Sequence, residues 1–167
     1  MHFKKVYLYL IILTTLIVFT LLPLFTEANM TSAEKLAIKQ SLPWLNSTIT
    51  FTDIYANNFF IATLTLIPIA GNAFLLRVMY DTGRVLMALD ANPILLFLNP
   101  IFWLEYGVYA YSFTTSILLF KDLFDYFSGT SKQDKMTLLR VWFKRAHYVI
   151  ARIAIVLLFS AVLEVII

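Results

Sequence analysis

The chain has no cysteine and only two histidines in 167 residues. The absence of cysteine excludes disulfides, thiolate nucleophiles and sulfur-bound metals. His2 and His147 lie at opposite ends of the chain, so a zinc-type cluster is not expected. With four glycines there is no phosphate-binding glycine loop, and no serine has a histidine nearby to act as its base. We therefore expect a protein that is not an enzyme and that has no cofactor, no metal and no catalytic residue.

Charged residues are also scarce, at 14%, whereas hydrophobic residues make up 60% and the mean hydropathy is +0.80. A soluble domain of this length could not cover so much apolar surface with so few charges. The composition therefore predicts an all-α, polytopic membrane helix bundle, with residues 1–167 forming a single integral membrane domain. The net charge of +3 is small and its basic residues flank apolar runs, so no nucleic-acid partner is expected.

Apolar runs predict about five transmembrane segments. The first covers residues 6–25, and it is longer than the apolar core of a signal peptide, which favours a retained anchor helix. Residues 26–52 form a polar outer loop, in which the capping-box spacing of Thr31 and Glu34 predicts a short helix that ends at Ser41. The other predicted spans cover residues 54–70, 73–89, 100–120 and 147–167.

The second and third spans belong to one apolar run, residues 54–89, which would rise about 54 Å as a single helix. Pro68, Gly71 and Asn72 break this run in the middle. Each half is short for a crossing, so two arrangements remain open: two tilted helices, or a re-entrant hairpin buried by the other segments. Residues 91–100 contain two Asn-Pro steps and are predicted to form a loop or a broken turn.

Basic residues predict the orientation of the bundle. Residues 121–146 are predicted to form an inner, basic amphipathic segment that lies on the membrane face and attracts anionic lipid. Lys4 and Lys5 precede the first span, and both basic flanks are expected inside. The prediction is a multi-pass protein of the cell membrane with a cytoplasmic N-terminus and an outer C-terminus. Asn29 and Asn46 begin N-x-S/T triplets in the outer loop and are candidate glycosylation sites.

Polar side chains recur at the same helical spacing in two predicted spans. The two rows are Arg77, Asp81 and Arg84, and Glu105, Tyr109 and Ser112. Residues at i, i+4 and i+7 share one face of a helix, and charges at bilayer depth usually pair or face the bundle interior. We therefore expect one intramembrane polar network in which Arg77 or Arg84 pairs with Glu105. This network either holds the helices together or lines an ion path.

Five sequence landmarks occur in a characteristic order. They are Asn57-Asn58, Ile67 to Gly71, Tyr80 to Gly83, Pro100 to Glu105, and Ala161 to Val165. In this order, over about two thirds of the chain, the sequence resembles the stage II sporulation protein M family of prokaryotic membrane proteins. The short, membrane-only form looks more like the archaeal members. Family members often carry His-Gly where this chain has Ile101-Phe102, so a role for histidine there does not carry over.

The resemblance implies a membrane scaffold, which in spore formers serves cell-wall-remodelling enzymes. The function expected from the sequence is a non-enzymatic scaffold or accessory subunit that assembles with other integral membrane proteins in a hetero-complex. Two alternatives stay open. One is a small oligomeric transporter or channel that uses the Arg/Asp/Glu network. The other is an accessory subunit of a large respiratory or oxidase-type complex. The only features that favour it are the small size of the chain and its lack of cofactor ligands.

Overall fold

The structure is a computed structural model that describes residues 2–27, 30–42, 50–129 and 134–166. Every regular element in these residues is an α-helix, which confirms the predicted all-α class. In chain order the helices are α1 (His2–Thr26), α2 (Ser32–Ser41), α3 (Phe51–Leu64), α4 (Ala70–Ala88), α5 (Pro93–Leu98), α6 (Pro100–Phe127) and α7 (Lys135–Ile166).

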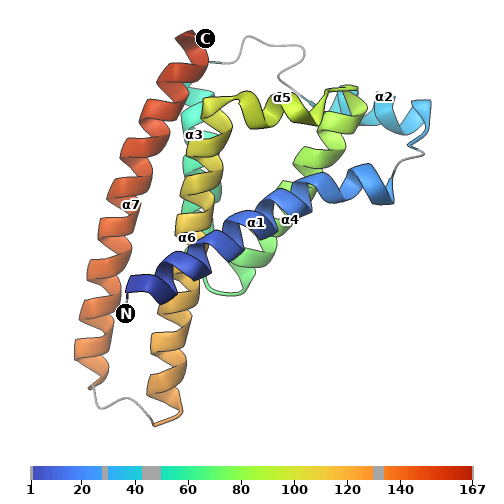
Figure 1. The fold of residues 1–167 in the computed structure, drawn as a ribbon. Coiled ribbons are helices and arrows are strands. Elements are labelled where there is room, and N and C mark those ends of the chain that lie inside the picture. The colour runs from blue at the N-terminus through green and yellow to red at the C-terminus, as the bar shows by residue number, and fades with distance from the viewer. Residues whose placement is uncertain (1, 28–29, 43–49, 130–133, 167) are drawn as a thin grey trace.

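The helices form two groups that α1 connects. The long helices α6 and α7 run antiparallel, and α3 packs against both of them (Figure 1). On the other side α4 packs along α1, and α2 contacts the end of α4. Figure 1 shows α1 crossing α6 at a steep angle, and α1 contacts both α4 and α6. The position of α1 therefore decides how the two groups fit together.

The core lies where these helices meet. Its fully buried side chains include Leu16 on α1, Leu75 on α4, and Ile153 and Leu157 on α7. The largest aromatic contribution comes from α6, where Phe102 and Tyr106 pack with their ring centroids 4.0 Å apart. The core thus draws on residues that are far apart in the sequence, as expected for a bundle held by helix–helix packing.

Two helical stretches are long and apolar enough to cross a membrane by length and composition, Lys4–Thr26 and Met136–Ile166. The other helices fall short of that test for visible reasons. Helix α3 has 14 residues, α4 carries three charges, and α6 combines Glu105 with many hydroxyl-bearing residues. When each described helix is judged by itself, two qualify as membrane spans, which is fewer than the five or so that the sequence predicts.

The long central run is broken close to the predicted position: Pro68 lies in the break, whereas Gly71 and Asn72 belong to the first turn of α4. Helix α3 ends at Leu64 and α4 begins at Ala70. Between them Ile69 has a φ of 66°, a backbone region that a β-branched residue rarely occupies. A Cβ on Gly71 would lie 2.0 Å from the carbonyl oxygen of Leu64, so only glycine allows the chain to return this closely. The break at Pro68 is confirmed.

The prediction of a loop over residues 91–100 is wrong, because α5 occupies most of that stretch. Asn92 caps α5 by accepting the backbone N–H of Ile94, and Asn99 caps α6 by accepting that of Ile101. In both helices the proline that follows the asparagine is the first helical residue, where it has no hydrogen bond to lose. The Asn-Pro steps are helix starts.

The basic segment also differs from its prediction. Residues 121–127 continue α6, and residues 135–146 run without interruption into the last predicted span as one helix, α7. No proline or glycine occurs between Lys135 and Ile166, so nothing in the sequence turns the chain at residue 146. The described basic residues of this segment therefore lie near the adjoining ends of α6 and α7, and residues 135–146 are not a separate surface helix.

Candidate functional site

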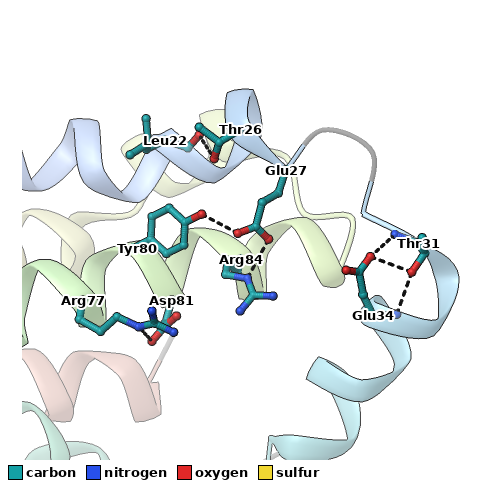
Figure 2. A network of polar contacts seen from close by, with 9 residues as sticks. All are labelled: Leu22, Thr26, Glu27, Thr31, Glu34, Arg77, Tyr80, Asp81 and Arg84. Atoms are coloured by element: carbon teal, nitrogen blue, oxygen red, sulfur yellow. Dashed lines mark hydrogen bonds and ion pairs between the residues drawn. The ribbon is translucent and has the colours of Figure 1, made fainter.

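The first polar cluster joins the end of α1 to α4. Glu27 follows the last turn of α1 and accepts two hydrogen bonds from α4: one from the Tyr80 hydroxyl at 2.5 Å, and one from Arg84 Nε at 2.8 Å (Figure 2). Tyr80 and Arg84 are four residues apart, so both side chains leave the same face of α4. The ion pair keeps about 30% of each charged side chain exposed, at 31% for Arg84 and 28% for Glu27. Glu27 thus fixes α1 to α4 by charge-assisted bonds.

A second ion pair lies on α4 itself. Arg77 Nε donates to Asp81 Oδ2 at 2.8 Å. Figure 2 shows this pair on α4 beside Arg84, on the side toward the start of the helix. Its side chains are 65% and 46% exposed. Neither residue bonds to another helix among the described residues. The predicted row of three charges is therefore divided: Arg84 serves the α1 contact, whereas Arg77 and Asp81 pair with each other on the surface of α4.

Helix α2 is attached beside this cluster. Thr31 and Glu34 form the predicted capping box, with the Thr31 backbone N–H bonded to Glu34 Oε2 at 2.7 Å. Lys35 Nζ pairs with Asp90 Oδ1 at 2.5 Å, which ties α2 to the end of α4. Hydrogen bonding and attraction by Lys35 hold the pKa of Asp90 below its ordinary value. The helix predicted from Thr31 to Ser41 is confirmed.

Acid should release α2 from α4. Because the folded pKa of Asp90 is lowered, its ion pair contributes fully above the unfolded aspartate pKa of about 3.9 and is lost as the pH falls through the folded value. Spin labels at Gln40 and Ala91 should report a larger separation at pH 2 than at pH 7, and Asp90→Asn should give that larger separation already at pH 7. The matched control is Asp53→Asn, which removes from the α3 cap a carboxyl whose pKa is also lowered by hydrogen bonds. A pH profile in Asp90→Asn equal to that of the native chain would rule the tether out.

The second polar cluster lies between α3 and α6. Asn58 Nδ2 donates to Glu105 Oε1, and the Tyr109 hydroxyl donates to Asn58 Oδ1 at 2.9 Å. Three residues after Tyr109, Ser112 donates its hydroxyl hydrogen to the carbonyl oxygen of Ala62 on α3. Ser112 is fully buried and Tyr109 is 3% exposed. The predicted row Glu105, Tyr109 and Ser112 therefore does share one face, and that face holds α3 against α6.

The predicted pairing of Arg77 or Arg84 with Glu105 is wrong. Within the described residues, Arg84 pairs with Glu27 and Arg77 with Asp81, while Glu105 bonds to Asn58. The reason is geometric, because α4 presents Arg84 to the end of α1 while α6 presents Glu105 to α3. The single intramembrane network expected from the sequence is two separate clusters.

Several residues of these clusters carry signals that the sequence prediction did not use. Glu27 closely follows the first apolar run, where a carboxylate can reach a neighbouring helix, and the prediction assigned it no role. Asn58 served as a family landmark, although an amide within an apolar helix also indicates an interhelical hydrogen bond. Thr20 and Tyr106 share a hydrogen bond of 2.6 Å inside the core, between α1 and α6. The candidate glycosylation residues, Asn29 and Asn46, lie outside the described residues.

These clusters hold helices together through hydrogen bonds and ion pairs. In the part of the chain that the structure describes, no three His, Asp or Glu side chains converge on a point where they could hold a metal ion. Comparisons of the chain with protein families, with curated proteins and with solved structures found no match. Over the residues that the structure describes, the chain is α-helical, with two helices long and apolar enough to cross a membrane and two interhelical polar clusters.

Proposed function

We propose that this protein is a multi-pass, non-enzymatic membrane scaffold or accessory subunit that assembles with other integral membrane proteins. Helices α1 and α7 meet the length and composition of a span, and α3, α4 and α6 pack directly on them. A bundle of about five spans follows if these three helices cross beside α1 and α7. The basic residues at Lys4, Lys5 and the α6–α7 end support a cytoplasmic N-terminus and an outer C-terminus.

The observation that carries the proposal is the exposed Arg77–Asp81 pair. The two side chains are 65% and 46% exposed on α4, and the described part of the chain does not cover them. Charged side chains in a bilayer are costly, and they almost always face a bundle interior or a water-filled cavity. A partner helix packed on this face of α4 would place the pair in such an interior. The face therefore suits lateral association with another membrane protein.

The resemblance to the stage II sporulation protein M family supports the same class of function. It rests on the five landmarks, and three of them lie at elements that shape the bundle: Asn58 bonds Glu105, Gly71 closes the central turn, and Gly83 lies against α1. A shared bundle can still host different tasks, so the partner has to be found by experiment.

Crosslinking in the native membrane tests the proposal. A photoreactive phenylalanine at Phe74 lies three residues before Arg77 on the exposed face of α4. We expect it to form a discrete adduct with one other membrane protein. The adduct should be lost in the double variant Arg77→Gln/Asp81→Asn. The matched control is Phe159, an exposed phenylalanine on α7, which should react with lipid alone.

The same experiment separates the proposal from its main alternative, an oligomeric transporter. An adduct of two copies of this chain, together with an ion flux in liposomes that disappears in Asp81→Asn, would favour the transporter and contradict the scaffold. Absence of any protein adduct from Phe74 would contradict both. The scaffold predicts silent liposomes and a heterologous adduct.

A further inference from the structure

A groove opens between the start of α1 and the adjoining halves of α6 and α7. Figure 1 shows the first turns of α1 beside these two helices. The groove has a volume of about 550 Å³, and its walls are largely apolar, with Leu118 and Leu119 from α6 and Tyr148 and Val149 from α7. This volume lies within the range of small-molecule sites.

The charges in this groove all have one sign. Lys5, Arg145 and Arg152 line it, and the described residues of its lining include no acidic side chain. Arg145 also bonds to Asp122 outside the groove, and Arg152 donates to the Tyr111 hydroxyl at 3.1 Å. Arg152 has no carboxylate partner among the described residues. The groove therefore presents cations from two different helices toward one apolar space.

A second hollow continues the first. It has a volume of about 510 Å³ and shares Tyr9, Tyr111 and Arg152 with the groove. Its other walls are apolar, among them Trp103 and Ile153, and it extends toward the start of α6. Together the two hollows form a channel along the bundle surface. One end is basic, and the other end is apolar.

We propose that this channel binds one anionic glycerophospholipid of the inner leaflet. The phosphate would lie among Lys5, Arg145 and Arg152, where cationic donors form charge-assisted hydrogen bonds with anionic oxygens. One acyl chain would run past Leu118 and Tyr111 into the second hollow. Arg152 starts deeper than Arg145 by seven residues of helix, about 10 Å, and a long side chain of this kind extends toward the headgroup level.

The order of charge and apolar surface identifies the ligand. A free phosphate would satisfy the cations and leave the apolar walls uncovered, whereas a neutral lipid would supply no anion to Lys5 and Arg152. An exposed basic surface attracts anionic lipid without selecting a position, because it has no walls. The channel combines both requirements in one place. This inference uses the orientation proposed above but not the partner assignment.

Lipid titration of the purified full chain by native mass spectrometry tests the site. We expect phosphatidylglycerol to bind at least about tenfold more tightly than phosphatidylcholine with the same acyl chains. Arg152→Gln should weaken phosphatidylglycerol binding about tenfold, the loss expected for one charge-assisted hydrogen bond, and Arg152→Lys should weaken it less. Lys5→Gln should weaken it in the same direction. Lys5 is exposed in the first turns of α1, so its replacement leaves the fold intact if Arg152→Gln does not fold.

The control is Lys144→Gln. Lys144 is exposed beside Arg145 but does not line the groove, so its loss removes the same charge at the same level and should leave the affinity unchanged. Three results would overturn the proposal: equal binding of the two lipids, equal weakening by Lys144→Gln and by the lining variants, or displacement of the lipid by inorganic phosphate. The first two indicate a non-specific surface and the third indicates a small-anion site. None of these results depends on whether a partner protein exists.

Discussion

Replacing Gly83 by alanine should force α1 away from α4 and cost the bundle about 2–3 kcal/mol of stability. A Cβ at this position would lie 2.0 Å from the carbonyl oxygen of Thr20 and 3.0 Å from Pro23 Cγ. The first contact is to backbone, which cannot rotate away. Thr20 also shares its hydroxyl hydrogen bond with Tyr106, so a shift of α1 disturbs α6 as well. The gain of about 1 kcal/mol in helix propensity is too small to compensate.

Unfolding of the detergent-solubilised protein by a denaturing detergent, followed by circular dichroism, measures this effect. Gly107→Ala provides the control, because it makes the same chemical change in a helix where the nearest atom is the movable Tyr9 hydroxyl at 3.2 Å. We expect Gly107→Ala to unfold close to the native chain or slightly later. If Gly83→Ala is as stable as Gly107→Ala, then α1 and α4 do not approach as closely as described.

Loss of the Glu27 carboxylate should have the second-largest effect. In Glu27→Ala the Arg84 guanidinium and the Tyr80 hydroxyl both lose their acceptor. Removing one partner of a fully buried ion pair costs about 3–5 kcal/mol. Because the two charged side chains here remain 28% and 31% exposed, water replaces part of the lost interaction and we expect about 2 kcal/mol. The same unfolding assay measures it.

A double-mutant cycle then distinguishes the two possible partners of Arg84. Glu27→Ala and Arg84→Ala should be coupled, with the double variant more stable than the sum of the single effects allows. Glu105→Gln and Arg84→Ala should be additive, because Glu105 bonds to Asn58 on another helix. Additive effects in the first pair, or coupled effects in the second, would show that Arg84 does not pair with Glu27 as described.

Local signals made part of the fold predictable. The capping box of Thr31 and Glu34 specifies the start of α2 through hydrogen bonds only three residues apart, so no tertiary information is needed. Pro68 interrupts the central run for an equally local reason. The Asn-Pro steps carried the right information as well, since asparagine is a favoured cap and proline a favoured first residue, but they were interpreted as a loop.

The partners of the polar residues could not be predicted in the same way. Periodicity shows that Arg77, Asp81 and Arg84 share a face, but it does not say which helix lies opposite that face. Arg84 bonds to Glu27 and not to Glu105 because α1 packs along α4, whereas Glu105 faces α3. The row from Glu105 to Ser112 was correctly placed on one face, yet its neighbour is α3 rather than α4.

The contact of α1 with α4 also bears on how the chain is made. Glu27 is separated from Arg84 by 57 residues, and Thr20 from Tyr106 by 86. At a synthesis rate of about 5–20 residues per second, the first helix waits roughly 3–11 s before the arginine that neutralises its carboxylate has been added. During this interval neither the ion pair of Glu27 with Arg84 nor the hydrogen bond of Thr20 with Tyr106 can form. Substitutions at Gly83 or Arg84 would therefore weaken the packing of α1 against α4 in newly made chains. The first effect in the cell would be rapid degradation of these chains.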